Sequence, residues 1–143
     1  MSIHLKLEGF DELLKEIEAA GKSADSAAES AVKAGAYAMQ SEMQSALRAA
    51  SESGLASRLP APQIEKHGNV IKARVGFEST PYDPRSPSDY FKAIFLNYGT
   101  PYRTKHGKES ARGFVTKAKR RSRPKIQKAQ KQALEKILQR LKK

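Results

Sequence analysis

The apolar positions of the first 50 residues recur at helical spacing and predict two helices of unequal length. The opening "IHLKLEG" has the composition of a short strand. For the helix that follows, we expect Asp11 to cap its start and Gly21 to end it. The apolar positions of this first helix are Phe10, Leu13, Leu14 and Ile17.

A second, longer helix is expected from about Ser23 to Ala50, with Ser23, Asp25 and Ser26 as candidate caps. Its apolar stripe comprises Ala28, Val32, Gly35, Ala36, Met39, Met43 and Leu47. The small side chains of this stripe would let another backbone approach closely. Two interpretations remain open, because the stripe can pack inside its own chain or form a contact between subunits. On the second interpretation the candidate interface residues are Met39, Met43 and Leu47.

The middle of the chain changes from helical spacing to strict alternation. Residues 51–69 are rich in Ser, Pro and Gly and are typical of a loop. The next apolar positions, Ile71 to Phe77, occupy every second residue and predict a half-buried strand. Because residues 67–69 have turn composition, residues 63–66 are a candidate hairpin partner for this strand.

An aromatic segment follows a loop that holds three prolines. Prolines exclude residues 78–89 from a helix or a central strand, and predict an exposed loop. We expect Asp89 to cap a short helix and Gly99 to end it, with Gly99 at positive φ. Its apolar positions are Phe91, Ile94, Phe95 and Tyr98. Since this is the densest aromatic cluster in the chain, we expect it to form the centre of the core.

The C-terminal part is polar and basic until a final amphipathic helix. Residues 100–123 show no lasting period, with Phe114 and Val115 as candidate anchors, and Pro124 suits the first turn of the last helix. The sequence thus predicts an α+β fold with long N-terminal and C-terminal helices packed on a small antiparallel sheet. We expect one domain over 1–143, with a basic C-terminal segment at 101–143.

Charge is distributed unevenly along the 143 residues. The formal net charge is +12, and the last 43 residues hold 16 basic and 2 acidic side chains. Such a basic pole favours an acidic partner. The candidate partner-facing residues are Lys117, Lys119, Arg120, Arg121, Arg123 and Lys125. Three interpretations stay open: a solvated charge run, docking on an acidic protein, or contact with DNA phosphates without sequence specificity.

The residues that usually carry catalysis are scattered or missing. The chain has no cysteine, and its three histidines, at 4, 67 and 106, have no carboxylate at metal-ligand spacing. The acids Glu78, Asp83 and Asp89 fall in or beside a proline-rich loop and make a weak magnesium site. We therefore expect no enzyme activity, no cofactor and no metal. No apolar run is long enough for a signal peptide or a membrane span, so we expect no membrane partner.

The order of short motifs resembles a known family. The motifs are "GFDEL" at 9–13, "SGLASRL" at 53–59, "ARVGF" at 73–77, "YFKAIFLNYGT" at 90–100 and "ARGFVTKAKRRSRPKI" at 111–126, before the final helix. This arrangement is similar to the tail-completion proteins of long-tailed bacteriophages and prophages, also called neck or head–tail joining proteins. Ser53 stands where that family usually has Thr, and Asn97 where it usually has an acid.

The resemblance implies a structural protein without catalytic residues. It implies a homo-oligomeric ring, expected to be a hexamer, between head connector and tail, with other phage neck and tail proteins as partners. The protein would be in the bacterial host cytoplasm during assembly and then in the virion. Further candidate interface residues are Tyr82, Arg85, Tyr98, Gly99 and Thr100, with Phe95 and Tyr98 expected to anchor the core first. The alternatives are a basic nucleic-acid-binding module and, less favoured, a nuclease or toxin.

Overall fold

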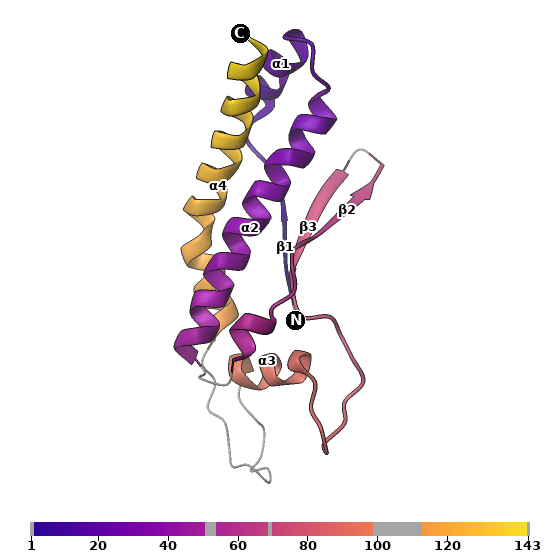
Figure 1. Cartoon of the computed structure of the whole chain (residues 1–143), viewed down its shortest axis with the longest axis vertical. Helices are drawn as coiled ribbons and strands as arrows, with labels where there is room; N and C mark the ends of the chain where they lie inside the picture. Colours follow the sequence, from indigo (N-terminus) through magenta and orange to yellow (C-terminus); the bar gives the residue numbers. More distant parts are fainter. Residues whose placement is uncertain (1, 51–53, 69, 99–112, 143) are drawn as a thin grey trace.

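The computed structural model describes residues 2–50, 54–68, 70–98 and 113–142, which form an α+β fold. The two long helices are α2 and α4, and α1 and α3 lie at opposite ends of the molecule (Figure 1). In chain order the elements are β1 (Ser2–Lys6), α1 (Asp11–Ala19), α2 (Ala24–Ala50), the 3-10 turn η1 (Leu55–Arg58), β2 (Gln63–His67), β3 (Val70–Gly76), α3 (Asp89–Tyr98) and α4 (Phe114–Leu141).

The two long helices pack side by side along the length of the molecule (Figure 1). Their close approach depends on Gly35, which faces α4. A Cβ at this position would lie 2.9 Å from Nε2 of Gln130 and 3.1 Å from Cγ2 of Ile126, tighter than ordinary contact. The small residues of the α2 stripe therefore serve the packing of α4 within one chain.

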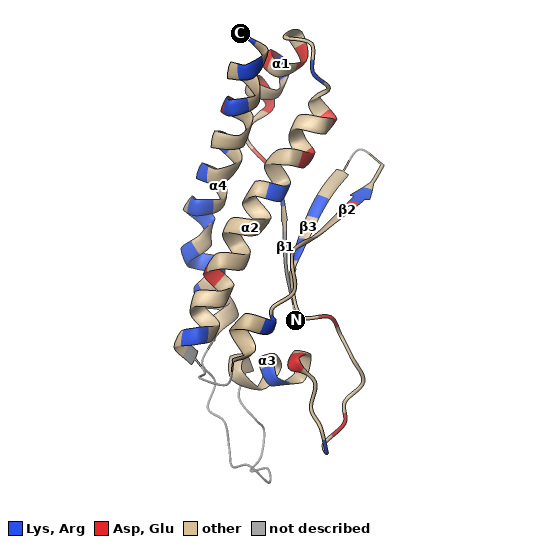
Figure 2. Cartoon of the chain, in the orientation of Figure 1, with Lys and Arg blue, Asp and Glu red and all other residues tan. Residues whose placement is uncertain are grey.

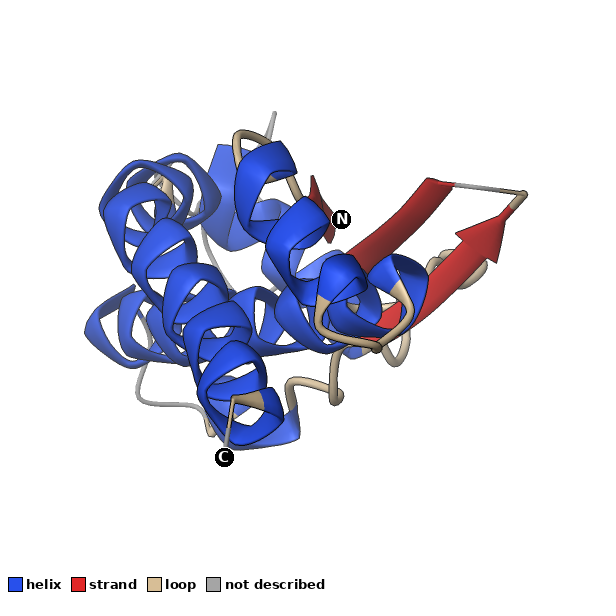
Figure 3. Ribbon diagram, turned by 90° about the horizontal axis from the view of Figure 1, so that it is seen from above, coloured by secondary structure: helices blue, strands red, loops and turns tan. Residues whose placement is uncertain are grey.

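The sheet is antiparallel and has the order β1-β3-β2. Ala73 in the central strand pairs with Leu5 on one side and Ile64 on the other. Buried Ile71, Ala73 and Val75 join the core with α2, as the alternating pattern predicted. The predicted β2–β3 hairpin is confirmed, and the helices lie to one side of the sheet (Figure 3).

The main core lies between α2, the sheet and the first half of α4. Met39, Met43 and Leu47 are 2%, 1% and 0% exposed there, so they contact their own chain and offer no surface to a second subunit. A smaller cluster joins α1, the first turns of α2 and the second half of α4. It comprises Ile17, Ala27, Ala31, Leu134 and Leu138.

The expectation that the aromatic helix forms the centre of the core is wrong. α3 lies at one end of the molecule, and its fully buried apolar side chain is Ala93. Phe91 and Phe95 are only half-buried. The core is filled instead by the alanine, methionine and leucine side chains of α2, because two long helices and a sheet enclose that face from both sides.

The helix ends agree with the sequence in two places. Gly21 follows α1 with φ 104°, and its N–H donates to the carbonyl of Glu18 at 3.1 Å, while the N–H of Lys22 donates to Ile17 at 3.3 Å. Ser23 accepts a hydrogen bond on its Oγ from the N–H of Ser26 at 3.5 Å, as expected of a helix cap.

Two predicted caps are wrong by one residue. Asp11 and Asp89 are the first helical residues of α1 and α3, and the preceding carbonyls, of Phe10 and Ser88, accept the first helical bonds. Both carboxylates still lie in a first turn, where the helix dipole favours negative charge.

The last helix begins ten residues before the predicted start. Pro124 lies inside α4 and not in its first turn, so that expectation is wrong. The first turns bury Phe114, Ala118 and Ser122. Since only one of these three is strongly apolar and basic residues surround them, the sequence shows no clear period here.

Candidate assembly surfaces

Aromatic side chains gather at the α3 end of the molecule. The ring of Tyr82, from the 78–88 loop, lies 4.9 Å from that of Phe91 and 6.2 Å from that of Phe95, measured between centroids. Tyr98 follows Phe91 and Phe95 at i+7 and i+3, so it shares their helix face. We call these four residues, Tyr82, Phe91, Phe95 and Tyr98, the aromatic surface.

The aromatic surface is left partly open to solvent. Tyr82 is 52% exposed and Tyr98 is 70% exposed. The expectation that Tyr98 anchors the core is therefore wrong. Clustered exposed aromatic side chains are typical of sites of protein interaction.

The other interface candidates are placed differently. Arg85 is exposed in the 78–88 loop, where its backbone N–H donates to Oδ1 of Asp83 at 2.9 Å. Gly99 and Thr100 lie outside the described residues. The structure thus brings Tyr82 and Tyr98 to one surface, while Met39, Met43 and Leu47 lie in the core.

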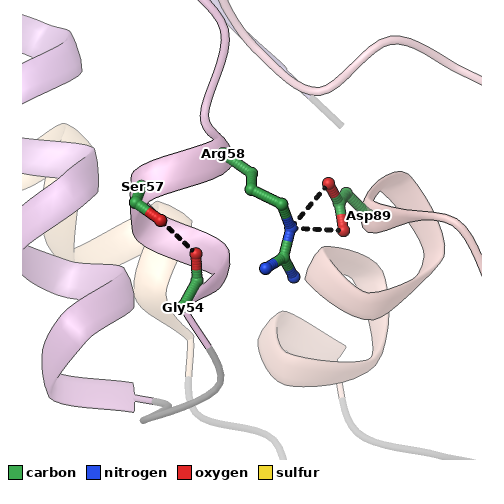
Figure 4. Close-up of polar contacts among 4 residues, drawn as sticks. All are labelled: Gly54, Ser57, Arg58 and Asp89. Atoms are coloured by element: carbon green, nitrogen blue, oxygen red, sulfur yellow. Dashed lines mark hydrogen bonds and ion pairs between the residues drawn. The ribbon is translucent and has the colours of Figure 1, made fainter.

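An ion pair holds the start of α3 against the turn that follows α2. Nε of Arg58 lies 3.2 Å from Oδ1 and 3.1 Å from Oδ2 of Asp89 (Figure 4). The turn itself is closed by the hydroxyl of Ser57, which donates to the carbonyl of Gly54 at 2.7 Å. Because Leu55 in this turn is buried in the core, the pair fixes α3 to the rigid body of the protein.

The other end of α3 is joined to α4 by Asn97. This side chain is 6% exposed, and its Oδ1 accepts a hydrogen bond from the N–H of Val115 at 3.1 Å. Its backbone carbonyl accepts from the N–H of Gly113, also at 3.1 Å. The sequence showed Asn97 in a position where the resembled family usually has an acid, but it did not reveal the contact with α4. This contact requires only an oxygen acceptor at the start of α4.

The predicted basic residues form one exposed region on the first three turns of α4, and we call it the basic face. Its members are Lys117, Lys119, Arg120, Arg121, Arg123 and Lys125. They lie on one continuous helix, although the sequence shows no lasting period over residues 100–123. Along the whole of α4 there are ten Lys or Arg and one Glu, so positive charge extends over most of its length (Figure 2). This geometry presents the charges on a rigid support.

Within the described parts of the chain, no helix combines the length and apolarity needed to cross a membrane. Over the same residues, no group of three His, Asp or Glu side chains lies close enough to hold a metal ion. Comparisons with family models, curated proteins and solved structures find no match to the chain.

Proposed function

We propose that the chain is a structural subunit of the head–tail junction of a long-tailed bacteriophage or prophage. It would assemble with copies of itself into a ring, which we expect to be a hexamer, and join the tail to the head connector. The observation that carries the proposal is the aromatic surface, which gathers at one end of the molecule and is left partly exposed.

The resemblance in the sequence supports the same proposal. It implies long helices packed on a small sheet, and the fold has this architecture. The motif at 53–59 contains η1 and Arg58, and the motif at 90–100 contains most of α3. Arg58 of the first motif contacts Asp89, the residue directly before the second motif, beside the aromatic surface.

The subunits would associate through complementary surfaces, without any chemical step. Exposed aromatic side chains lose water contact when a neighbour covers them, which favours association. Arg58, Asp89 and Asn97 hold α3 before binding, so little conformational freedom is lost on assembly.

Light scattering and negative-stain microscopy of the purified protein test the proposal. We expect rings of several subunits, with or without duplex DNA. The variant Tyr82→Ser with Tyr98→Ser should weaken the assembly while leaving the fold intact, because both side chains are largely exposed. Tyr37→Ser is the matched control, since Tyr37 is 48% exposed on α2 and lies outside the aromatic surface. A protein that stays monomeric at every concentration would refute self-assembly into a ring.

The second candidate is a nucleic-acid-binding module, which the basic face favours. Phosphate contacts by Lys and Arg release counterions, so affinity should fall steeply as salt rises. We expect Arg120→Glu, Arg121→Glu and Arg123→Glu together to abolish such binding. Tight, salt-sensitive binding of duplex DNA by a monomer would favour this candidate over the ring.

A further inference from the structure

Negative charge is concentrated in a segment most of which lies away from the basic face; its first acid, Glu8, lines a hollow together with Lys119 and Arg123 of that face. Residues 8–29 hold seven acidic and two basic side chains, and all seven acids are exposed. We call these acids the acidic segment: Glu8, Asp11, Glu12, Glu16, Glu18, Asp25 and Glu29. They lie on and around α1 and the first turns of α2, at the end where α4 finishes (Figure 2). The basic face lies on the half of α4 that begins beside α3.

Most of these charges form no ion pair with any residue that the structure describes. In the acidic segment, Glu8 pairs with Lys6 at 3.3 Å and Glu29 with Lys66 at 4.0 Å. Among described residues, the other five acids form no ion pair, and in the basic face only Lys125 does, with Glu42. Five acids and five cations are thus left over on separate surfaces.

The acidic segment also borders a hollow. A cavity of about 340 Å³, open to solvent, lies between the starts of α2 and β3. Its walls include the carboxyl-bearing residues Glu8 and Asp25 and the apolar residues Leu14 and Val32. Lys6 also lines it and pairs with Glu8, so among the described residues Asp25 is the carboxylate without an ion pair there. This mixture suits a long cationic side chain, whose aliphatic stem packs on apolar atoms while its charged end meets a carboxylate.

We infer that the basic face of one copy docks on the acidic segment of a second copy, with a Lys or Arg side chain entering this hollow. The inference rests on the self-assembly proposed above and names the surfaces that meet. Since the two surfaces differ, the contact is head-to-tail, and such contacts close into rings when the rotation between copies allows it. The charges set the register and the rate of encounter, while the aromatic surface supplies apolar burial.

A nucleic acid is the less favoured occupant of the basic face. It would cover the cations of α4 and leave the five unpaired acids without a partner. A second copy provides opposite charge to both surfaces at once.

Two charge-reversed full-length variants test the inference. The first carries Arg120→Glu and Arg121→Glu, and the second carries Glu12→Lys and Asp25→Lys. Each variant lowers the charge of one surface and places like charges at the substituted positions of the contact, so each alone should self-associate more weakly, with the dissociation constant raised roughly tenfold or more. Mixed in equal amounts, the two should assemble again, because each then meets the opposite charge. One chain carrying all four substitutions should assemble alone for the same reason.

The control is Lys33→Glu with Lys72→Glu, two exposed lysines outside the basic face. It changes the net charge by the same amount as the first variant and should assemble as the wild type does. The neutral variant Glu12→Gln with Asp25→Asn is measured alongside, because it removes the two negative charges and places no new positive charge near the helix starts. It should weaken assembly less than the charge reversal does. Circular dichroism of each variant checks that it is folded.

The outcomes separate this inference from the proposed function. If the wild type assembles and both reversed variants assemble equally well, the charge contact is refuted while the ring proposal stands. If the reversed variants fail and their mixture does not recover, the surfaces do not meet each other. If the first variant assembles normally but loses DNA binding, the basic face serves nucleic acid. A wild type that never self-associates refutes the ring and this contact together.

Discussion

Oδ1 of Asn97 accepts a hydrogen bond from the backbone N–H of Val115, 3.1 Å away, and so caps the start of α4 from the end of α3. The first N–H groups of a helix have no partner within the helix itself. Here the partner comes from a residue 18 positions earlier, and it is almost fully buried. This side chain therefore joins α3, which carries most of the aromatic surface, to α4, which carries the basic face.

Replacing Asn97 should destabilise the protein. Asn97→Ala removes the acceptor and leaves the N–H of Val115 unsatisfied, so we expect a loss of about 1–2 kcal/mol in the free energy of unfolding. Asn97→Asp keeps an oxygen acceptor next to the positive end of the helix dipole, and should retain more of the stability. Urea denaturation followed by circular dichroism measures both. Equal stability of Asn97→Ala and the wild type would show that this cap is unimportant.

Gly35 should not tolerate a methyl group. Gly35→Ala gains about 1 kcal/mol of helix propensity. However, the new Cβ meets Cγ of Gln130 and Cγ2 of Ile126, each at 3.1 Å, and overpacking usually costs about 1–3 kcal/mol. We expect a net decrease in thermal stability.

The partner variant locates the cause of that decrease. Gln130→Ala frees space at the contact. Gly35→Ala should therefore lower the melting temperature less in the Gln130→Ala background than in the wild type. The comparison is a double-mutant cycle of melting temperatures. Additive effects of the two substitutions would contradict a direct clash.

The proline inside α4 should reduce stability at its present position. It removes one helical hydrogen bond, and its ring crowds the carbonyl four residues earlier. Because Pro124 is exposed, Pro124→Ala should raise the free energy of unfolding by roughly 1–3 kcal/mol.

Pro84→Ala is the matched control for this prediction. Pro84 follows Asp83 in a turn closed by the N–H of Ser86, which donates to the carbonyl of Asp83 at 3.2 Å. Proline suits that turn position and restricts the unfolded chain, so its removal should lower stability by up to about 1 kcal/mol. Chemical denaturation should therefore give changes of opposite sign in the free energy of unfolding for Pro124→Ala and Pro84→Ala.

The ion pair between Arg58 and Asp89 should contribute little to global stability. Its side chains are 44% and 31% exposed, so water and salt weaken the attraction. A double-mutant cycle with Arg58→Gln and Asp89→Asn should give a coupling energy below about 1 kcal/mol, decreasing as salt rises. A larger, salt-independent coupling would mean that the pair is shielded from solvent. The more sensitive measurement is hydrogen exchange of α3, which should become faster in both variants.

The sequence alone determined the elements whose pattern is local. Alternation at Ile71 to Phe77 identified β3, and the glycine at 21 marked the end of α1, where the structure has a φ of 104°. The apolar stripe of α2 was also visible, as was the segregation of charge. These features depend on residues close together in the chain, so periodicity and turn chemistry were enough.

Only the tertiary structure decided which of these features are buried and which are free. Met39, Met43 and Leu47 could line an interface or a core, and α4 and the sheet enclose them. Tyr98 has a core-like spacing, yet α3 lies at the end of the molecule where nothing described covers it. The start of α4 depends on Asn97, which a local reading of residues 113–124 does not include. Burial and long-range capping are set by contacts between distant segments, and a pattern along one segment carries no information about them.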